Sequence, residues 1–182
     1  MPTIPYQDDP GPDAAEVVAA IRARRGGRLL NLDRMLLHNP RVAAGWGALM
    51  GPIRNSPNIS ARHRELAICA VARLNGADYE FRHHTGPWLR DGGTQAQLDA
   101  LDDVAAASRD TDLFDAADRA VLAFALDSTR HVRIAADTLA AVRTHFPDPA
   151  AVFDLTMIVA SYNMVARVLV GLDIGFEAPV VT

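Results

Sequence analysis

The feature that most constrains the fold is a long apolar segment near the C-terminus, from about Ala150 to Val170. Its apolar residues fall on more than one stripe of a helix, so a helix here must be covered on several sides by other elements. Helical periodicity also dominates the rest of the sequence, and no stretch of alternating apolar and polar residues competes with it. The sequence therefore predicts an all-α protein in which this helix is covered by others.

Prolines, glycines and capping residues divide the rest of the chain into shorter helices. Prolines crowd the first twelve residues, which predicts an extended arm over residues 1–12 followed by a single helical domain over 13–182. We expect Asp13, Ser60 and Thr94 to cap helices, because their side chains accept hydrogen bonds from free backbone N–H groups. The expected helices cover about 13–25, 30–38, 40–50, 60–74, a segment after Gly76, 94–101, 114–126, 134–146 and 150–170, and 51–58 is an expected loop.

The composition fits one soluble domain. With 182 residues, 49% of them hydrophobic, the chain is long enough for one full core and too short for two ordinary domains. The sequence has neither a span of about 18 uninterrupted apolar residues nor an N-terminal signal pattern. A single cysteine, Cys69, excludes an intrachain disulfide and suits a reducing compartment. We therefore predict a cytoplasmic protein without a membrane partner.

The charged residues narrow the chemistry further. All 18 basic residues are arginines, and the formal net charge is -4. The lack of lysine excludes a mechanism through a lysine Schiff base. The only dense basic run lies between residues 22 and 28, where cationic side chains also complement the dipole of a helix end. Nucleic acid is therefore not an expected partner.

Two glutamates and a histidine form the most chemically informative pattern. Glu80 and His84 are four positions apart, so on one helix they project from the same face and are close enough for a hydrogen bond. Glu65 lies on the preceding predicted helix, and only the tertiary fold can bring it to them. Carboxylates and an imidazole in one site can share and transfer protons. We predict that Glu65, Glu80 and His84 are catalytic, although Glu80 as an exposed carboxylate and Glu65 in an ion pair with a neighbouring arginine are the alternatives.

The spacing of these residues resembles that of the carboxymuconolactone decarboxylase and alkylhydroperoxidase D superfamily of small all-helical proteins. In its peroxidase branch the motif is Glu, eleven residues, Cys-x-x-Cys, three residues, His. This chain has Glu65, eleven residues, Ala77-Asp78-Tyr79-Glu80, three residues and then His84. The glutamate and the histidine keep their places, and both cysteines are lost.

Two further patches extend the resemblance over about residues 28–175. One is the segment Tyr162-Asn163-Met164 near the C-terminus. The other is an Asn, Arg, His-x-Pro and Trp signature, formed in this chain by Asn31, Arg34, His38, Pro40 and Trp46. The match is strongest over residues 59–102.

The resemblance implies a helical bundle that assembles as a homotrimer or homohexamer, and a lyase that needs no cofactor. In the decarboxylases that it resembles, a muconolactone from aromatic catabolism loses carbon dioxide by acid–base catalysis with a histidine and a glutamate. We therefore expect a small-molecule acid or lactone as the substrate. Arginine suits a second substrate carboxylate and aromatic residues suit the pocket wall, and the substrate-binding candidates are Arg34, Arg73, Arg82, Tyr79 and Trp46.

Two alternatives stay open. A peroxidase of the same fold needs a thiolate and a second thiol, and Cys69 lies in an apolar run that is typical of a buried core residue. A non-catalytic or metal-binding protein would instead use imidazoles and carboxylates, which suit iron, zinc or manganese. Adjacent residues such as His83 and His84 cannot both face one ion on a regular helix. His38 and His63 match no recognised metal spacing, so no metal ligand is predicted.

Overall fold

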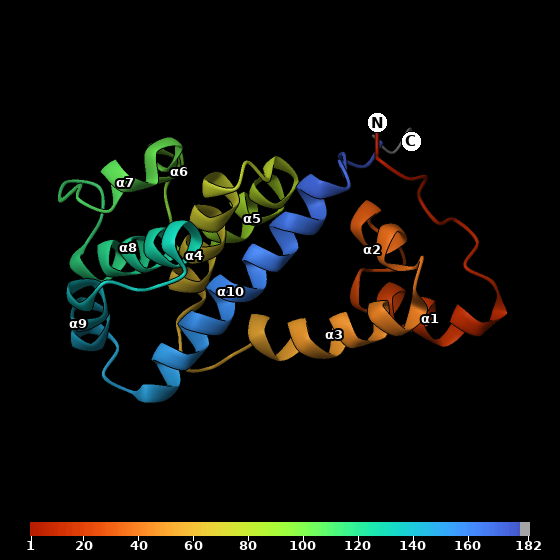
Figure 1. The fold of residues 1–182 in the computed structure, drawn as a ribbon, viewed down its shortest axis with the longest axis horizontal. Helices are drawn as coiled ribbons and strands as arrows, with labels where there is room; N and C mark the ends of the chain where they lie inside the picture. The colour runs from red at the N-terminus through yellow and green to blue at the C-terminus, as the bar shows by residue number, and fades with distance from the viewer. Residues whose placement is uncertain (179–182) are drawn as a thin grey trace. The chain divides into compact units, whose positions relative to one another are not determined.

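The computed structural model describes residues 1–178 and contains helices but no strand over that range (Figure 1). This confirms the predicted all-α class. The α-helices are α1 (Ala15–Arg24), α2 (Asn31–Leu36), α3 (Pro40–Arg54), α4 (Ala61–Leu74), α5 (Asp78–Arg90), α6 (Gln95–Ala100), α7 (Val104–Ala107), α8 (Ala116–His131), α9 (Ala136–His145) and α10 (Pro149–Gly171). Short 3-10 helices, η1 and η2, cover Pro12–Ala14 and Leu101–Asp103.

The described residues group into two compact units. The first consists of Met1–Pro52 together with the chain from Leu169 onward, and the second is Ile53–Val168. The predicted catalytic residues all belong to the second unit. The assignment of residues 13–182 to a single domain stays a prediction.

The N-terminal arm lies against its own chain within the first unit. The backbone N–H of Thr3 donates to the carbonyl oxygen of Leu172 at 2.9 Å, and His38 Nε2 lies 2.8 Å from the carbonyl oxygen of Pro5. Arg34 stacks its guanidinium over the ring of Tyr6, with 4.5 Å to the centroid. Residues 1–11 lie outside the helices, and the side chains of Arg34 on α2 and of His38 just after α2 contact them. The extended arm over residues 1–12 stays a prediction.

Two of the expected helix boundaries are wrong. Asp13 does not cap α1, because Pro12 opens a 3-10 turn and Ala14, which has no capping side chain, precedes the helix. The loop expected over residues 51–58 begins later, because α3 continues through Pro52 to Arg54. Pro52 is exposed and close to the end of α3, where the loss of one backbone hydrogen bond leaves a carbonyl that water can reach.

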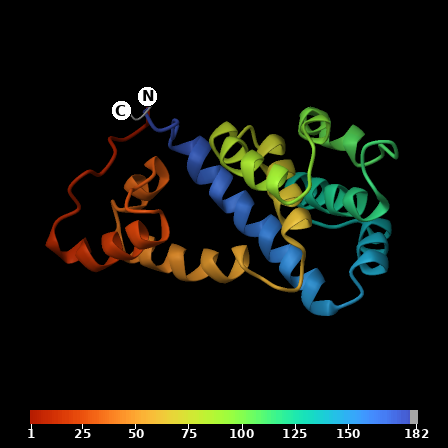
Figure 2. The same ribbon diagram turned by 180° about the vertical axis from the view of Figure 1, so that it is seen from behind.

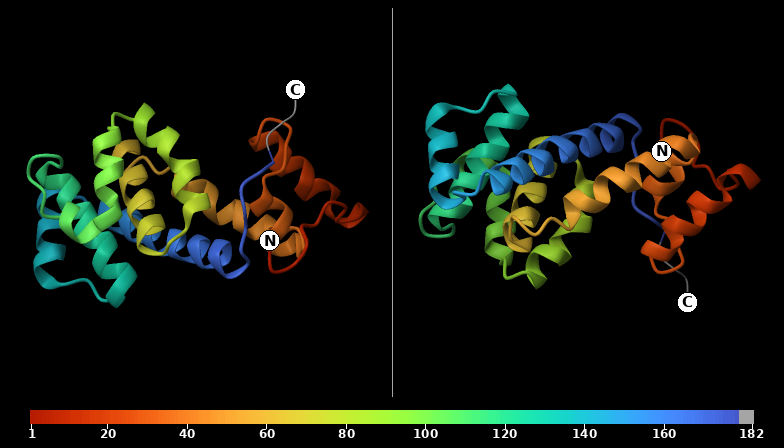
Figure 3. Two further views of the ribbon diagram at one scale, coloured as in Figure 1. Left: turned by 90° about the horizontal axis from the view of Figure 1, so that it is seen from above. Right: turned by 90° about the horizontal axis from the view of Figure 1, so that it is seen from below.

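The second unit is built around α4. Residues 66–72 of this helix are completely buried, and the helix packs against α5 and α8. Figure 2 shows α4 and α5 beside α10. Helix α9 packs against α8 and lies next to it in Figure 3. Ser60 and Thr94 cap α4 and α6, each accepting a backbone N–H three residues later at 3.2 Å. Both predicted caps are confirmed.

The long apolar helix is α10. It is 23 residues long, and by length and composition alone it could cross a membrane, although half of its most apolar window is buried inside the structure. A core helix of a soluble protein has the same length and composition, so the absence of a membrane partner stays a prediction. Phe153, Met164 and Val170 on α10 are exposed. The homo-oligomer also stays a prediction.

Candidate active site

The candidate site begins with a hydrogen bond between side chains of α4 and α5. His84 Nδ1 lies 2.6 Å from Glu65 Oε2, and the two residues are 19 positions apart in the sequence. Both side chains are mostly buried, with exposed fractions of 17% for His84 and 8% for Glu65. The second oxygen of Glu65 accepts a longer hydrogen bond from Arg64 Nε at 3.4 Å. The structure thus brings together two of the three predicted catalytic residues, which we call the Glu65–His84 pair.

This contact sets the roles of the two imidazole nitrogens. Because the carboxylate of Glu65 can only accept, Nδ1 of His84 carries the hydrogen. Nε2 has no hydrogen-bond partner among the described residues. Burial lowers the pKa of His84, and the hydrogen bond to Glu65 opposes this effect. A neutral His84 therefore presents a lone pair at Nε2.

Glu80 lies one turn before His84 on α5 but does not bond to it. The sequence spacing allows a hydrogen bond between Glu80 and His84, but in the structure the imidazole bonds to Glu65 of α4 across the helix interface. Glu80 is only 2% exposed, and within residues 1–178 neither of its carboxyl oxygens has a hydrogen-bond partner. Burial of a carboxyl group without a hydrogen bond destabilises the fold by about 1–3 kcal/mol or more.

Burial controls the protonation of Glu80. Removal from water raises the pKa of Glu80 well above its ordinary value, and the charge of Arg54 reverses this only in part. Glu80 therefore keeps its proton at pH values where an exposed glutamate is ionised. The site combines a neutral carboxylic acid with a histidine that is held neutral, and both lie on the same helix.

Tyr162 of α10 and Arg54 of α3 complete the surroundings. The ring of Tyr162 meets that of His84 edge-on, with 5.1 Å between the centroids. Arg54 Nε donates to Tyr162 Oη at 3.0 Å. Burial raises the pKa of Tyr162 to about 12, so the phenol stays protonated. The Tyr-Asn-Met segment had marked Tyr162 in the sequence, but no sequence signal marked Arg54.

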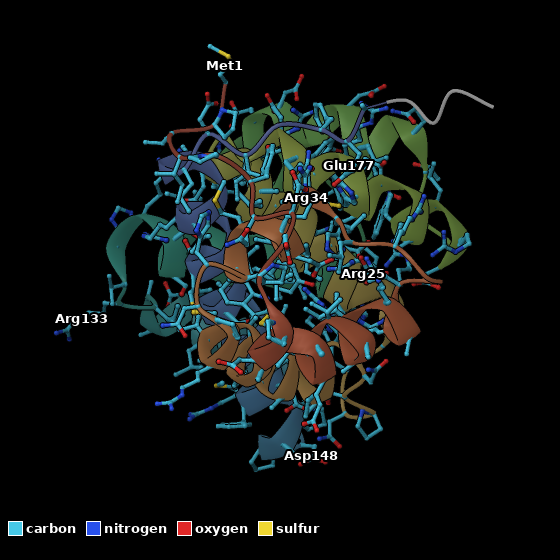
Figure 4. The ribbon with its side chains drawn as sticks, turned by 90° about the vertical axis from the view of Figure 1, so that its right-hand side faces the viewer. Met1, Arg25, Arg34, Arg133, Asp148 and Glu177 are labelled. Atoms are coloured by element: carbon cyan, nitrogen blue, oxygen red, sulfur yellow. The ribbon has the colours of Figure 1, made fainter. Side chains whose placement is uncertain are left out.

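Two of the three predicted arginines, Arg34 and Arg73, form ion pairs with carboxylates outside the Glu65–His84 pair. Arg34 belongs to the first unit, where it pairs with Asp8 at 2.5 Å and appears among the side chains labelled in Figure 4. Arg73 pairs with Asp102 at 3.3 Å, and its guanidinium covers the ring of Phe81. Arg82 is exposed on α5. The charges of Arg34 and Arg73 are thus matched by protein carboxylates.

The two aromatic candidates also have other surroundings. Tyr79 is buried on α5 and stacks on the ring of His83, with 4.2 Å between centroids. Trp46 is half-buried on α3 in the first unit. His83 itself turns its Nδ1 to the carbonyl oxygen of Tyr79 at 2.7 Å. Substrate contacts of Tyr79 and Trp46 stay predictions.

Cys69 lies on α4 one turn after Glu65 and is completely buried. Burial raises the pKa of the Cys69 thiol, and the nearby carboxyl groups of Glu65 and Glu80 raise it further. The thiolate is the reactive form of cysteine. In this environment Cys69 is a small core residue and not an activated nucleophile.

A separate group of potential metal ligands lies beside α8. One ligand atom each of His63, Asp115 and Asp118 lies within 4.8 Å of the other two. The carboxylate of Asp118 already accepts hydrogen bonds from both terminal nitrogens of Arg62, one of them at 2.7 Å. Asp115 caps α8 by accepting a hydrogen bond from the backbone N–H of Asp118 at 2.8 Å. A cation would have to compete with Arg62 for Asp118, so the arrangement suits a structural ion pair better than a metal centre.

The first unit contains a cleft of about 380 Å³ between α1 and α3. It is mainly apolar and is lined by Val17 and Ile21 on one side and by Ala44 and Gly47 on the other. None of the predicted catalytic residues lines it. The candidate site therefore rests on the chemistry of the Glu65–His84 pair and Glu80, and not on this cleft.

The comparisons agree with the motif and the fold. The model of the carboxymuconolactone decarboxylase family matches residues 40–125, which include all three predicted catalytic residues. The structure has the same fold as solved structures of alkylhydroperoxidase D-like proteins. In motif and fold the chain is similar to the carboxymuconolactone decarboxylase and alkylhydroperoxidase D-like superfamily. Against the motif of the peroxidase branch, Ala77 and Glu80 occupy the positions of the paired cysteines.

Three solved structures show how far the fold is shared. An uncharacterized peroxidase-related protein from Silicibacter sp. TM1040 has a TM-score of 0.78 and 20% identity, over 97% of this chain and 92% of that one. A debrominase in complex with 2,3,4-tribromopyrrole has a TM-score of 0.75 and 21% identity, over 97% and 91%.

The third is the alkylhydroperoxidase D core of an uncharacterized peroxidase-related protein from Ralstonia eutropha JMP134. Its TM-score is 0.77 with 16% identity, over 97% of this chain and 93% of that one. No curated protein matches the chain. At these identities the structures establish the fold, and the activity must be argued from the site.

Proposed function

We propose that the protein is a cofactor-independent lyase of the carboxymuconolactone decarboxylase type, acting on a small carboxylated lactone or a related acid. The observation that carries the proposal is the Glu65–His84 pair, with Nε2 of His84 unpartnered, beside the buried and unpartnered carboxyl group of Glu80. The family match over residues 40–125 supports the same class of enzyme.

The chemistry requires one proton donor and one electron sink. When the bond between the substrate carbon and its carboxylate breaks, carbon dioxide leaves and the electron pair moves into the lactone or carbonyl group as an enolate. A proton must then be added to carbon. Burial raises the pKa of Glu80, so Glu80 keeps a proton at pH values where an exposed glutamate is ionised, and it gives this proton to the enolate. General acid catalysis of this kind contributes about a hundredfold to ten-thousandfold in rate.

His84 returns the proton to Glu80. It lies one turn away on α5 and, with 17% of its side chain exposed, it is the member of the site that water reaches. A neutral imidazole takes up a proton at Nε2, and the carboxylate of Glu65 stabilises the imidazolium that forms. The carboxylate of Glu80, ionised after the transfer, receives this proton and the site is ready for another turnover.

The energetics of Glu80 support a functional role. A buried carboxyl group without a hydrogen bond destabilises the fold, so a purely structural position would favour an apolar side chain. Strongly shifted pKa values in such groups are typical of functional sites. The combination of Glu80 and the Glu65–His84 pair is what acid–base catalysis without a cofactor needs.

Carbon dioxide release from 4-carboxymuconolactone by the purified protein tests the proposal directly. We expect turnover in the wild type and a loss of about a hundredfold or more in His84→Ala and in Glu80→Gln. His83→Ala is the matched control, because His83 is the neighbouring imidazole and it bonds to the backbone of its own helix. Wild-type protein that releases no carbon dioxide, or His84→Ala with full activity, would contradict the proposal.

The peroxidase alternative comes from the peroxidase-related structures of similar fold. Reduction of a hydroperoxide by a dithiol needs a thiolate and a second thiol that resolves the sulfenic acid. Cys69 is the only cysteine of the chain and it is completely buried. A hydroperoxide-reduction assay with a thiol donor separates the two activities, and we expect no thiol-dependent turnover above the background rate.

A further inference from the structure

One face of α10 carries a row of apolar side chains at the surface of the second unit, which we call the α10 stripe. Phe153 is 62% exposed and Met164 is 36% exposed. Between them, Met157 is half-buried and Ala160 is exposed. All four residues belong to the part of α10 that lies in the second unit. A continuous exposed row of this kind is typical of a surface that another molecule covers.

The spacing of the α10 stripe indicates the shape of its partner. Its four residues follow each other at intervals of four, three and four positions. Apolar residues at this heptad spacing form one seam along a helix, and a second helix with the same seam packs its side chains between them. Tyr162 lies nine positions after Phe153, about two and a half turns, so it points to the opposite side of α10, where its ring contacts His84. The stripe is therefore separate from the candidate active site.

The α10 stripe is complementary to itself when a second copy runs in the opposite direction. Its centre falls between Met157 and Ala160, so an antiparallel α10 places these two residues against each other. At both ends of the stripe, Phe153 of one copy then faces Met164 of the other. Each contact occurs twice, as two-fold symmetry requires. Methionine sulfur packs favourably against an aromatic ring, and alanine leaves room for the longer methionine.

The charges beside the α10 stripe fit the same direction. Arg167 is exposed, and its terminal nitrogen donates to the backbone oxygen and the side-chain oxygen of Asn163, both at 2.9 Å. In an antiparallel pair, Arg167 lies level with residue 150 of the other copy, close to the exposed Asp148. Within residues 1–178 neither Arg167 nor Asp148 has an ion-pair partner. A parallel pair would instead bring Arg167 next to its own copy, and like charges repel.

We propose that the α10 stripe binds the α10 stripe of a second copy of this chain, antiparallel and about a two-fold axis. From Phe153 to Arg167 the contact is about 21 Å long, at about 1.5 Å per residue. This is at the small end of stable interfaces, which bury about 1,200–2,000 Å² in total, so we expect a dissociation constant in the micromolar range. The assembly then contains an even number of copies. This inference does not depend on the proposed reaction.

Sedimentation equilibrium of the full chain, from low micromolar to hundreds of micromolar protein, measures the association. The wild type should form dimers or a larger assembly with an even number of copies. Ala160→Glu places a charge at the centre of the stripe in both copies and should raise the dissociation constant at least about a hundredfold. Val132→Glu is the matched control and should assemble like the wild type, because Val132 is an apolar residue outside α10 that is 87% exposed. Circular dichroism checks that each variant is folded.

Cysteine cross-linking tests the direction of the pair. In a Cys69→Ala background, a mixture of Phe153→Cys and Met164→Cys proteins should form a disulfide-linked heterodimer on mild oxidation. Phe153→Cys protein alone should not cross-link, because the antiparallel pair separates the two copies of position 153 by about 16 Å along the helices. A parallel pair predicts the reverse.

Four results would overturn the proposal: a wild type that stays monomeric at hundreds of micromolar, an assembly with an odd number of copies, an assembly that Ala160→Glu leaves intact, or cross-linking of Phe153→Cys with itself and not with Met164→Cys. Monomeric protein that sediments with vesicles of phosphatidylcholine and phosphatidylglycerol would also overturn it, and would assign the α10 stripe to a lipid surface.

Discussion

His84 Nδ1 and Glu65 Oε2 lie 2.6 Å apart at the interface of α4 and α5, in a position from which water is largely excluded. The contact orients the imidazole, fixes its tautomer and supplies a negative charge that stabilises the protonated ring. It is therefore the part of the site whose removal should have the clearest effect on acid–base chemistry.

Glu65→Gln should lower the rate of carbon dioxide release by about a hundredfold. The amide has nearly the same shape as the carboxylate and can still accept from Nδ1, but it lacks the charge that stabilises the imidazolium. The pKa of His84, followed by NMR, should fall further in this variant because the hydrogen bond and charge of Glu65 raise it. Glu16→Gln, which changes an exposed glutamate of α1, is the control and should match the wild type. An unchanged pKa of His84 in Glu65→Gln would contradict the assigned contact.

The pH dependence of kcat/KM should be bell-shaped. His84 must be neutral, and because its pKa is lowered by burial, activity should persist below pH of about 6.5, the ordinary value for histidine. Glu80 must be protonated. Because its pKa is raised, activity should decline only at a pH well above about 4.3, the ordinary pKa of glutamate. The apparent pKa values of the two limbs describe His84 and Glu80 as an interacting pair, and neither value belongs to one residue alone. If acidification already reduced kcat/KM at or above about pH 6.5, the result would be inconsistent with a neutral His84.

Glu80→Met should stabilise the fold while it abolishes turnover. The side chain has a similar length but no unpartnered polar atoms, so we expect a gain of about 1–3 kcal/mol near neutral pH. In the wild type the unfolded chain releases the proton of Glu80 above about pH 4.3, whereas the folded chain keeps it. Stability that is present below this pH is therefore lost as the pH rises toward the raised pKa of the folded state.

Urea unfolding at an acidic and a mildly alkaline pH measures this effect. The difference between wild type and Glu80→Met should be larger at the alkaline pH, because methionine removes the titration. Glu16→Met serves as the control, since Glu16 is exposed. A Glu80→Met protein that is less stable than the wild type at both pH values would show that the carboxyl group has a stabilising partner in solution.

Cys69→Ala should retain full lactone turnover. Its thiol is completely buried and burial raises its pKa, so a thiol reagent should leave the native protein unlabelled and react only after denaturation. Loss of the sulfur from the core should cost about 1 kcal/mol in the free energy of unfolding. Rapid labelling of the native protein, or loss of activity in a stably folded Cys69→Ala variant, would instead support a thiol-dependent reaction.

Local structure could be predicted well where it depends on close neighbours in the chain. The caps at Ser60 and Thr94 are confirmed, because each is a contact between residues three positions apart. The errors at Asp13 and in the loop expected over 51–58 arose where proline was read as a boundary. In the structure Pro12 opens a 3-10 turn and Pro52 lies inside α3.

The candidate site was predictable in its residue types but not in its contacts. Glu65, Glu80 and His84 are all mostly or completely buried in the second unit, yet the partner of His84 is Glu65 and not Glu80. Arg34 and Arg73, expected at the substrate, pair with carboxylates of the protein. Arg54, which the sequence did not mark, bonds to a tyrosine 108 positions away.

The sequence by itself determined the all-α class and most of the helices. It also placed Glu65 and His84 at the motif positions and Glu80 at the position of the second cysteine. These properties follow from helical periodicity, capping and spacing, which act over a few residues. Only the tertiary structure decided that Glu65 orients His84, that Glu80 is buried with no hydrogen-bond partner among the described residues, and that Arg54 bonds to Tyr162. Those contacts depend on how α3, α4, α5 and α10 pack, because packing brings together side chains that the chain itself keeps far apart.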